Sequence, residues 1–432
     1  MSSQNHTINQ VRVDVTGNEY GLVSKMQQQL SFAFNTGSFL SQLETLFDSL
    51  VPGGEYLEIQ SLEIEMNDFK NRNLQSLLVK VIETSIREKL NSSSRNEIKI
   101  RTKQTFENEI YSGFLKFGIL LNTSDKELID RLHCEISQLR DNSKPYIESV
   151  LNKIGAQDPF VWKRLFFLLG TEGMMKYCQR VYHYDINLLK KLLAIVTRDK
   201  GNAPPAYTLP GGEPEFWKQI VPVMVNGWPE EKIKDMFSTD DSSGVNLPET
   251  IMQETRASFS RHIELEKAVN EGITIENAGM VMLWIELGKL IRELGYISDK
   301  SFKDTRHQQE AILLFHYVYS GNTDFREEEL LLYKILCGWP VDEPVDPAFI
   351  PELKECETAD RMLNDYIMVW RKDRNFSANW FRNTFLAREG ILAKRPDGNW
   401  SLEIQKKTED ILITKTSVVR YSWMRELIFV NW

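Results

Sequence analysis

The sequence lacks the features that direct a chain into or across a membrane. Its first six residues, Met1-Ser2-Ser3-Gln4-Asn5-His6, are polar and do not show the basic-then-apolar pattern of a signal peptide. Its longest clearly apolar run, Ala278 to Ile285, is far shorter than the roughly 18 residues that cross a bilayer. We therefore expect a protein that is made and folded in the cytoplasm, without membrane insertion.

The chain also has few cysteines and histidines, and it has no excess of positive charge. Lys and Arg number 52 against 61 Asp and Glu, so the formal net charge is −9. This balance argues against a nucleic-acid binder, because such a protein needs excess Lys and Arg to neutralise phosphate. The four cysteines form no CxxC pair, and the six histidines show neither HxxxH nor HExxH spacing. We expect reduced, largely buried thiols, no metal site, no cofactor and no nucleic-acid partner.

No catalytic motif is present, since the sequence contains no Walker A, GxGxxG or GxSxG pattern. If Gly244 were the sixth position of a calcium loop, Asp241 would be a ligand, but the other ligand positions would supply too few carboxylates to hold the ion. Cys178 and His183 are five residues apart, about 500° of helical rotation, which is wrong for a nucleophile and its base. We expect no enzyme, although a site assembled from distant residues stays an alternative.

One cluster of basic and aromatic residues suggests a nucleic-acid stacking surface. Its members are Arg371, Lys372, Arg374, Trp380 and Arg382. Because acidic residues interrupt it and the whole chain is acidic, we interpret it as a structural helix pair with a charged rim.

The length of 432 residues, with 42% hydrophobic residues, predicts two or three domains that each bury a core. Residues 1–105 predict a small α+β domain. Its elements include a strand in residues 8–15, a strand from Tyr56 to Met66, a helix from Leu74 to Leu90 and a strand from Glu97 to Arg101.

Residues 106–265 predict a helical region with a Pro/Gly-rich linker near 200–214, and the helical pattern continues to about residue 330. Two breakers share a tripeptide, Gly227-Trp228-Pro229 and Gly338-Trp339-Pro340. Each predicts a left-handed glycine that ends a helix, a Trp that packs back on the last turn and a Pro that stops continuation. The repeat suggests stacked helix pairs in a solenoid-like layer.

Residues 266–432 predict a third domain that is helical first and then forms a β-hairpin. Its expected helices run from Glu357 to Trp370 and from Ala378 to Arg388. A turn at Arg395 to Gly398 separates strands at Gly390–Leu392 and Trp400–Ile404, and Ile411–Ile413 and Leu427–Val430 predict further strands. The fold class predicted for the whole chain is mainly α with small α+β ends.

Several segments, in order, resemble the contractile injection system tape measure protein family of phage-tail-like particles. The similarity covers Asn277-Ala278-Gly279 with Leu294-Gly295-Tyr296, the stretch from His307 to Gly321, the stretch from Glu328 to Pro340, and the segments around Trp370 to Gly390 and Trp423 to Trp432. His6 to Asn9 and Leu62 to Glu65 resemble the start of the family. Trp284-Ile285 and Tyr333 depart from its usual Pro-Phe and Asn. The motif positions, expected to be structural or partner-binding, are Asn277, Gly279, Gly295, Gly321, Glu329, Lys334, Leu336, Cys337, Gly338, Pro340, Trp370, Arg382, Phe385, Arg388, Gly390, Trp423 and Trp432.

The resemblance implies a structural or assembly role in a bacterial contractile particle, without catalysis. It also implies partners among the tail tube, baseplate and cap proteins, with an AAA+ ATPase encoded alongside, and incorporation into the particle. The alternative is a folded helical-repeat adaptor or assembly chaperone that binds tail proteins.

The tape-measure role and the composition of the chain are in tension. As one helix, 432 residues would span about 650 Å. The 23 Gly and 15 Pro residues do not permit such a rod and indicate compact domains instead. Either the chain folds compactly and extends inside a tube, or it acts as a folded assembly factor.

Overall fold

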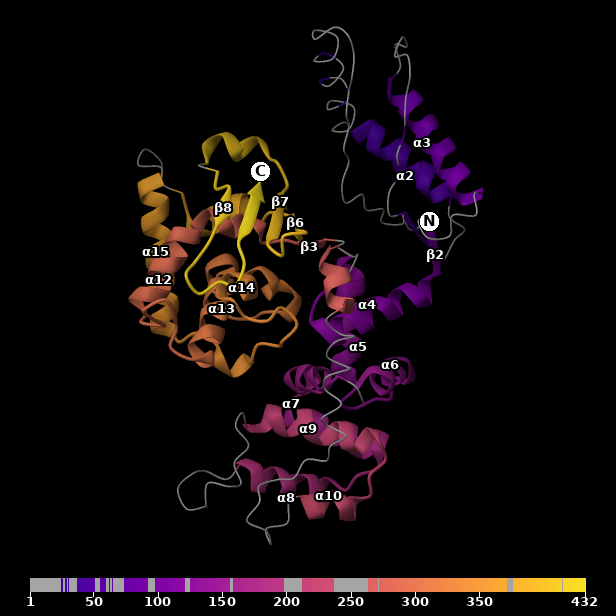
Figure 1. Cartoon of the computed structure of the whole chain (residues 1–432), viewed down its shortest axis with the longest axis vertical. Helices are drawn as coiled ribbons and strands as arrows, with labels where there is room; N and C mark the ends of the chain where they lie inside the picture. The colour runs from indigo at the N-terminus through magenta and orange to yellow at the C-terminus, as the bar shows by residue number, and fades with distance from the viewer. Residues whose placement is uncertain are drawn as a thin grey trace. The chain divides into compact units, whose positions relative to one another are not determined.

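The structure is a computed structural model, shown in Figure 1. It describes residues 37–50, 55–59, 74–91, 98–120, 125–155, 158–197, 212–236, 263–270, 272–370, 376–413 and 415–432, and the isolated positions 25, 28, 30, 62 and 64. Several predictions lie outside the described residues: the strand in 8–15, most of the linker at 200–214, the loop around Gly244, the N-terminal motif from His6 to Asn9 and the basic residues at 371, 372 and 374.

The chain divides into two compact units, Met1–Glu109 and Ile110–Trp432. Both are mainly helical with small β elements, so the predicted fold class is confirmed. The division into three domains, at residues 105 and 265, stays a prediction, as does the solenoid-like stacking.

Among its described residues, the first unit contains helices α2 (Gly37–Leu50) and α3 (Leu74–Asn91) and a two-stranded sheet of β1 (Glu55–Ile59) and β2 (Ile98–Thr102). β1 and β2 are antiparallel, with Ile59 opposite Ile98. Phe39, Leu43 and Leu46 recur at helical spacing on α2 and form a small core with Leu78 of α3. The helix and the second strand expected here from periodicity are confirmed within a residue or two.

The second unit begins with a series of helices. They are α4 (Lys103–Phe117, which starts in the first unit), α5 (Lys126–Gln138), α6 (Pro145–Gly155), α7 (Pro159–Tyr182), α8 (Ile186–Thr197), α9 (Gly212–Val225) and α10 (Glu230–Met236). Asp158 caps α7 by accepting a hydrogen bond from the Phe160 amide, and Pro159 occupies the first helical position. α7 consists of two helical segments, because Gly170, at φ 69° and ψ 176°, is not helical and breaks the helix between Leu169 and Thr171.

The rest of the second unit surrounds a mixed sheet. Its helical elements are η2 (Ala278–Leu283), α12 (Trp284–Glu293), α13 (Thr305–Ser320), η3 (Glu327–Leu330), α14 (Leu331–Cys337), η4 (Pro347–Phe349), α15 (Leu353–Trp370), α16 (Ala378–Phe381), the π-helical turn η5 (Arg382–Leu386) and η6 (Thr408–Leu412). Its strands are β3 (Ile273–Ile275), β4 (Ile297–Ser298), β5 (Ser301–Phe302), β6 (Gly390–Lys394), β7 (Trp400–Ile404), β8 (Val418–Val419) and β9 (Ile428–Asn431).

Among the described residues, the larger sheet has the strand order β3-β6-β7-β9-β8. The expected hairpin pairs β6 with β7, with Leu392 opposite Leu402. β9 runs parallel to β7, whereas the other neighbours are antiparallel. Figure 1 shows α13 and α14 beside this sheet, in orange. Leu392, Leu402 and Val430 point into the same core as α13 and α14.

Several sequence predictions are wrong in detail. The strand expected from Tyr56 to Met66 ends at Ile59, and Leu62 and Ile64 lie in no strand. The segment expected as a strand at Ile411–Ile413 lies in the 3₁₀ helix η6 and the turn after it. The side chain of Asp410 accepts a hydrogen bond from the Lys407 amide and pairs with Arg388, which fixes a helical turn there. In addition, β3 and the β4–β5 hairpin interrupt the region to residue 330 that was expected to be helical throughout.

Both shared tripeptides end helices as predicted. Gly227 and Gly338 are left-handed, at φ 71° and 68°. In each, the glycine amide and the following Trp amide donate to carbonyls of the last helical turn, as in a Schellman motif; the Trp339 amide lies 2.8 Å from the Lys334 carbonyl oxygen. Among the described helices, none is long and apolar enough to cross a membrane.

Candidate functional site

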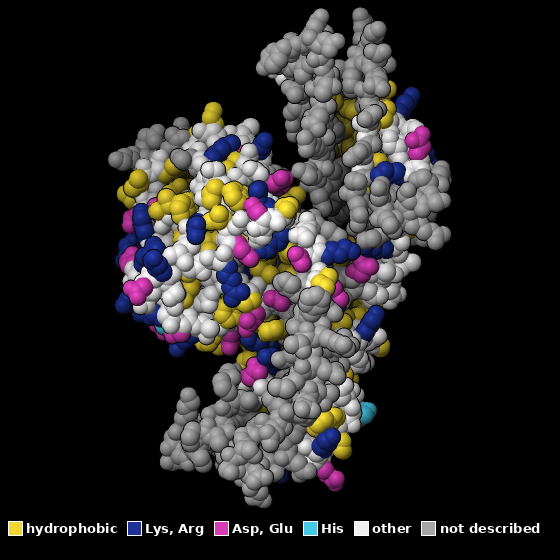
Figure 2. Space-filling view, in the orientation of Figure 1, with side chains coloured by type: hydrophobic (Ala, Val, Ile, Leu, Met, Phe, Trp, Pro, Cys, Tyr) yellow, Lys and Arg dark blue, Asp and Glu magenta, His cyan; other side chains and the backbone are white. Residues whose placement is uncertain are grey.

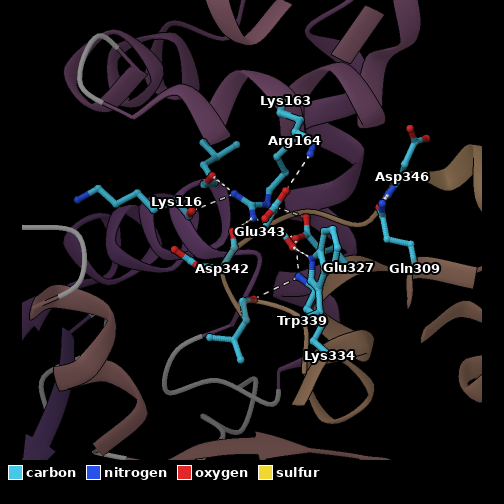
Figure 3. A network of polar contacts seen from close by, with 12 residues as sticks. Lys116, Lys163, Arg164, Gln309, Glu327, Lys334, Trp339, Asp342, Glu343 and Asp346 are labelled. Carbon is cyan, nitrogen blue, oxygen red and sulfur yellow. Dashed lines mark hydrogen bonds and ion pairs between the residues drawn. The ribbon is translucent and has the colours of Figure 1, made fainter. Parts of the chain in front are cut away.

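A network of buried charged residues lies within the second unit, where α7 meets the segment before α14. Figure 3 shows Arg164 of α7 and Lys334 of α14 approaching the carboxylate of Glu327 in η3. The side chains of Arg164 and Lys334 are each only 1% exposed, and that of Glu327 is 11% exposed. Buried ionic groups require complete pairing, so the contacts of each atom are informative.

Arg164 is fully satisfied by the groups around it. Its Nε and Nη2 atoms donate to the two oxygens of Glu327 at 2.6 and 3.0 Å. Its Nη1 donates to the carbonyl oxygens of Leu115 and Lys116 at the end of α4, and Nη2 also donates to that of Asp342. The planar guanidinium therefore ties α4, α7, η3 and the loop after α14 together, which a point charge would do less well.

Lys334 completes the network from the other side of Glu327. Its Nζ donates to Glu327 Oε1 at 2.9 Å and to the Val341 carbonyl oxygen at 3.2 Å. Gly118, the left-handed residue after α4, lies against the same carboxylate, since a Cβ there would be 2.3 Å from Glu327 Oε1. The network thus leaves no room for a side chain at position 118.

The pKa values follow from these contacts. Burial alone would raise the pKa of Glu327, but the charges and hydrogen bonds of Arg164 and Lys334 outweigh it and lower that pKa to about 2. Burial lowers the pKa of Lys334, and the carboxylate of Glu327 opposes this shift. Glu327 consequently carries its charge throughout the physiological pH range.

An ion pair and a further hydrogen bond lie on either side of the network. Arg326 pairs with Asp130 of α5 at 2.7 Å, and Glu328 Oε1 lies 2.8 Å from Nε2 of His133. Arg326, Glu327 and Glu328 thus each contact a helix from the first half of the unit. Three consecutive side chains join helices α5 and α7 to the C-terminal part of the chain.

The motif glycines lie at close approaches of the backbone. A Cβ on Gly279 would be 1.8 Å from the Phe385 carbonyl oxygen, and one on Gly338 would be 2.7 Å from the Trp423 carbonyl oxygen. A Cβ on Gly390 would meet Ala278, and one on Gly321 would meet the Arg382 guanidinium. A Cβ on Gly295 would lie 3.5 Å from Lys303 Nζ. Motif segments far apart in sequence therefore pack against one another.

The two motif arginines are buried and paired with carboxylates. Arg382 donates to the Val318 carbonyl oxygen and to Asp360 Oδ1, both at 2.9 Å. Arg388 is 1% exposed and pairs with Asp410. Arg382, which the sequence also places in a basic and aromatic cluster, is thus engaged inside the fold.

The motif tryptophans bridge loops to the rest of the unit. The Nε1 atoms of Trp370, Trp423 and Trp432 donate to the carbonyl oxygens of Leu412, Leu336 and Thr416, at 3.1, 3.0 and 2.9 Å. Phe385 packs edge-on against Trp370, with ring centroids 5.0 Å apart.

The remaining motif residues lie around α14. Asn277 Nδ2 donates to the Glu329 carbonyl oxygen at 2.8 Å, and the Glu329 carboxylate accepts from the Arg326 amide. The Cys337 carbonyl oxygen accepts from Gln308, and that of Pro340 accepts from the Glu343 amide. A role of any motif residue in partner binding stays a prediction.

Other chemistry-bearing side chains do not converge. Within the described ranges, no group of three or more His, Cys, Asp or Glu side chains could hold a metal ion. Cys178 is buried, which raises the pKa of its thiol, and His183 is exposed at the end of α7. One cavity of about 410 Å³ is lined by residues that include His183, Tyr184, Trp228 and Glu230.

The sequence analysis missed Glu327, Asp360 and Asp410, which pair with motif residues, and Arg164, which pairs with Glu327. A signal for Arg164 existed, because Lys163 and Arg164 are the two charges within the otherwise apolar run from Phe160 to Leu169. Glu327 stands two helical turns before Lys334, but this spacing alone does not separate a buried pair from an exposed one.

The fold and this network define a mainly helical protein with a small mixed sheet, whose distant segments are joined by buried ion pairs. The sequence model of the contractile injection system tape measure protein family matches residues 5–432. The chain therefore belongs to this family. Comparisons with curated proteins and with solved structures gave no match.

Proposed function

We propose that the protein is a structural or assembly component of a contractile injection system that acts on tube length or on assembly of the tube and baseplate. The family match over residues 5–432 carries this proposal. The proposed partners are tail tube, baseplate or cap proteins, with an AAA+ ATPase encoded alongside as a further candidate. We propose that it resides in the bacterial cytoplasm, becomes incorporated into the particle, and is not an enzyme.

A deletion tests the ruler role. Residues 238–261 lie outside the described part of the structure and include none of the residues that form the buried network. If the chain measures length in a helical conformation, deleting these 24 residues shortens the tube by about 36 Å. The matched control replaces the same residues with a helix-forming Ala/Glu/Lys segment of equal length, which leaves tube length unchanged for a helical ruler. Intact particles of unchanged length after the deletion would exclude ruler action.

The alternative function is a folded adaptor or chaperone that binds tail proteins during assembly. The buried pairing of Arg164, Glu327 and Lys334 favours it, since this pairing stabilises the compact form of the second unit. Quantitative mass spectrometry of purified particles separates the two roles. A protein present during assembly and absent from mature particles supports the adaptor, and a fixed copy number per particle supports the structural component.

A further inference from the structure

An exposed apolar patch lies at the C-terminal end of α15. It consists of Val369, Trp370, Phe376, Trp380, Ile411 and Leu412. Val369 is 73% exposed and Ile411 is 88% exposed, values unusual for large apolar side chains in a folded unit. Figure 2 shows hydrophobic side chains gathered, with Lys and Arg among them, where α15 and the sheet lie.

Specific contacts join the aromatic residues of this patch to one another and to η6. Trp370 Nε1 donates to the Leu412 carbonyl oxygen, which joins α15 to η6. The rings of Phe376 and Trp380 are stacked with centroids 4.1 Å apart, and the Phe376 ring also contacts that of Trp370. The patch therefore exists before a partner arrives, so binding there costs little ordering entropy.

The charge around the patch is opposite in sign to that of the chain. Residues 405–420, which include η6, contain four basic and two acidic residues, a net charge of +2, whereas the whole chain carries −9. Lys406 and Lys415, on either side of η6, are exposed, whereas Asp410 is neutralised by Arg388. An exposed carboxylate, Asp365, lies one turn before Val369 and only partly offsets this charge.

We propose that the patch binds an acidic amphipathic segment of another protein of the particle, with apolar side chains flanked by Asp or Glu. This partner rests on the proposed function. The charge favours it over a second copy of this chain, because a twofold contact would bring like charges together. A membrane is less favoured, since the rings of Trp370 and Trp380 are held against Phe376 and do not form a protruding wedge.

A photocrosslinking experiment tests the proposal. Benzoylphenylalanine is introduced at Val369 or Ile411 of the full-length chain, which is coexpressed with the tube, sheath, baseplate and cap proteins. Leu353 is the matched control, because it lies on the same helix, is 77% exposed and stands 16 residues from Val369. We expect crosslinks at positions 369 and 411 at least tenfold above those at 353, in a segment of net negative charge.

Charge reversal then tests the basic rim. With the crosslinked segment as a synthetic peptide, Lys406→Glu with Lys415→Glu weakens binding at least tenfold, whereas Leu353→Ser leaves it unchanged. Crosslinks only to copies of this chain, crosslinks to lipid, or yields equal to the Leu353 control would each overturn the proposal. If the protein is in the particle but positions 369 and 411 capture nothing, the patch proposal fails while the proposed function stands.

Discussion

Arg164 and Glu327 stand 163 positions apart in the sequence, yet two hydrogen bonds of 2.6 and 3.0 Å join the guanidinium to the carboxylate. Lys334 shares the same carboxylate at 2.9 Å. This arrangement makes one acidic group the counterion of two buried bases. The stability of the second unit should therefore depend strongly on Glu327.

Glu327→Gln should destabilise the protein by about 3–5 kcal/mol, because it leaves two buried positive charges without a counterion. Urea unfolding followed by circular dichroism measures this free energy. The control is Arg361→Met, which removes an exposed pair with Glu293 and should cost less than about 1 kcal/mol. The combined replacement Arg164→Met, Glu327→Leu and Lys334→Met should cost less than Glu327→Gln alone. Equal effects of Glu327→Gln and Arg361→Met would refute the importance of the buried pairing.

The stability provided by Glu327 should depend on pH in a defined window. Its pKa is about 2 in the folded state against 4.5 for the free group, so the unfolded chain binds the proton first. The contribution is complete above about pH 4.5 and is lost as the pH falls toward 2, by about 3 kcal/mol in total. Unfolding at pH 5, 4 and 3 should show that the difference between the wild type and Glu327→Gln shrinks with acid. A constant difference would contradict the low pKa.

The two shared tripeptides provide a matched pair of substitutions. Both Gly227 and Gly338 are left-handed, so alanine strains the backbone by about 1 kcal/mol at either position. A Cβ at 227 meets nothing within 4 Å, whereas one at 338 would lie 2.7 Å from the Trp423 carbonyl oxygen. Gly338→Ala should therefore lower the thermal midpoint clearly more than Gly227→Ala does. Equal shifts would mean that the Trp423 loop moves away at little cost.

The cysteines should differ sharply in reactivity. Cys134 is exposed, whereas Cys178 and Cys337 are buried and their thiol pKa values are raised by that burial. A thiol reagent such as dithionitrobenzoate should modify Cys134 quickly in the native protein, and Cys134→Ser should abolish this fast phase. Unfolding in urea should expose all four thiols. Fast native labelling of Cys178 would show that α7 opens readily.

Local features of this fold were predictable from the sequence. The helix at 74–91 and the hairpin of β6 and β7 follow from periodicity and from the turn at Arg395 to Gly398, which are properties of neighbouring residues. The helix ends at Gly227 and Gly338 are predictable for the same reason, because they depend on the backbone conformations that glycine and proline adopt. The segment at Ile411–Ile413 was misjudged because its β-branched residues favour a strand, whereas the hydrogen bond and ion pair of Asp410 favour a helical turn.

Pairings between distant residues were not predictable. Lys334 and Arg382 were identified through a family motif, but their counterions Glu327 and Asp360 belong to patterns that also suit exposed helix faces. Whether a charge is buried depends on which helices pack over it, and that depends on contacts between distant segments. The parallel pairing of β9 with β7 is of the same kind, because no turn connects the two strands.

The strand order of the larger sheet also determines the order in which its strands can pair during synthesis. β9 lies between β7 and β8, although residues 428–431 are synthesised after both of them. On the ribosome, β8 is therefore complete before the strand that it pairs with exists, and β7 has a vacant edge on one side. The sheet closes only after residues 428–431 have left the ribosome, and until then the unpaired edges of β7 and β8 are open to mispairing.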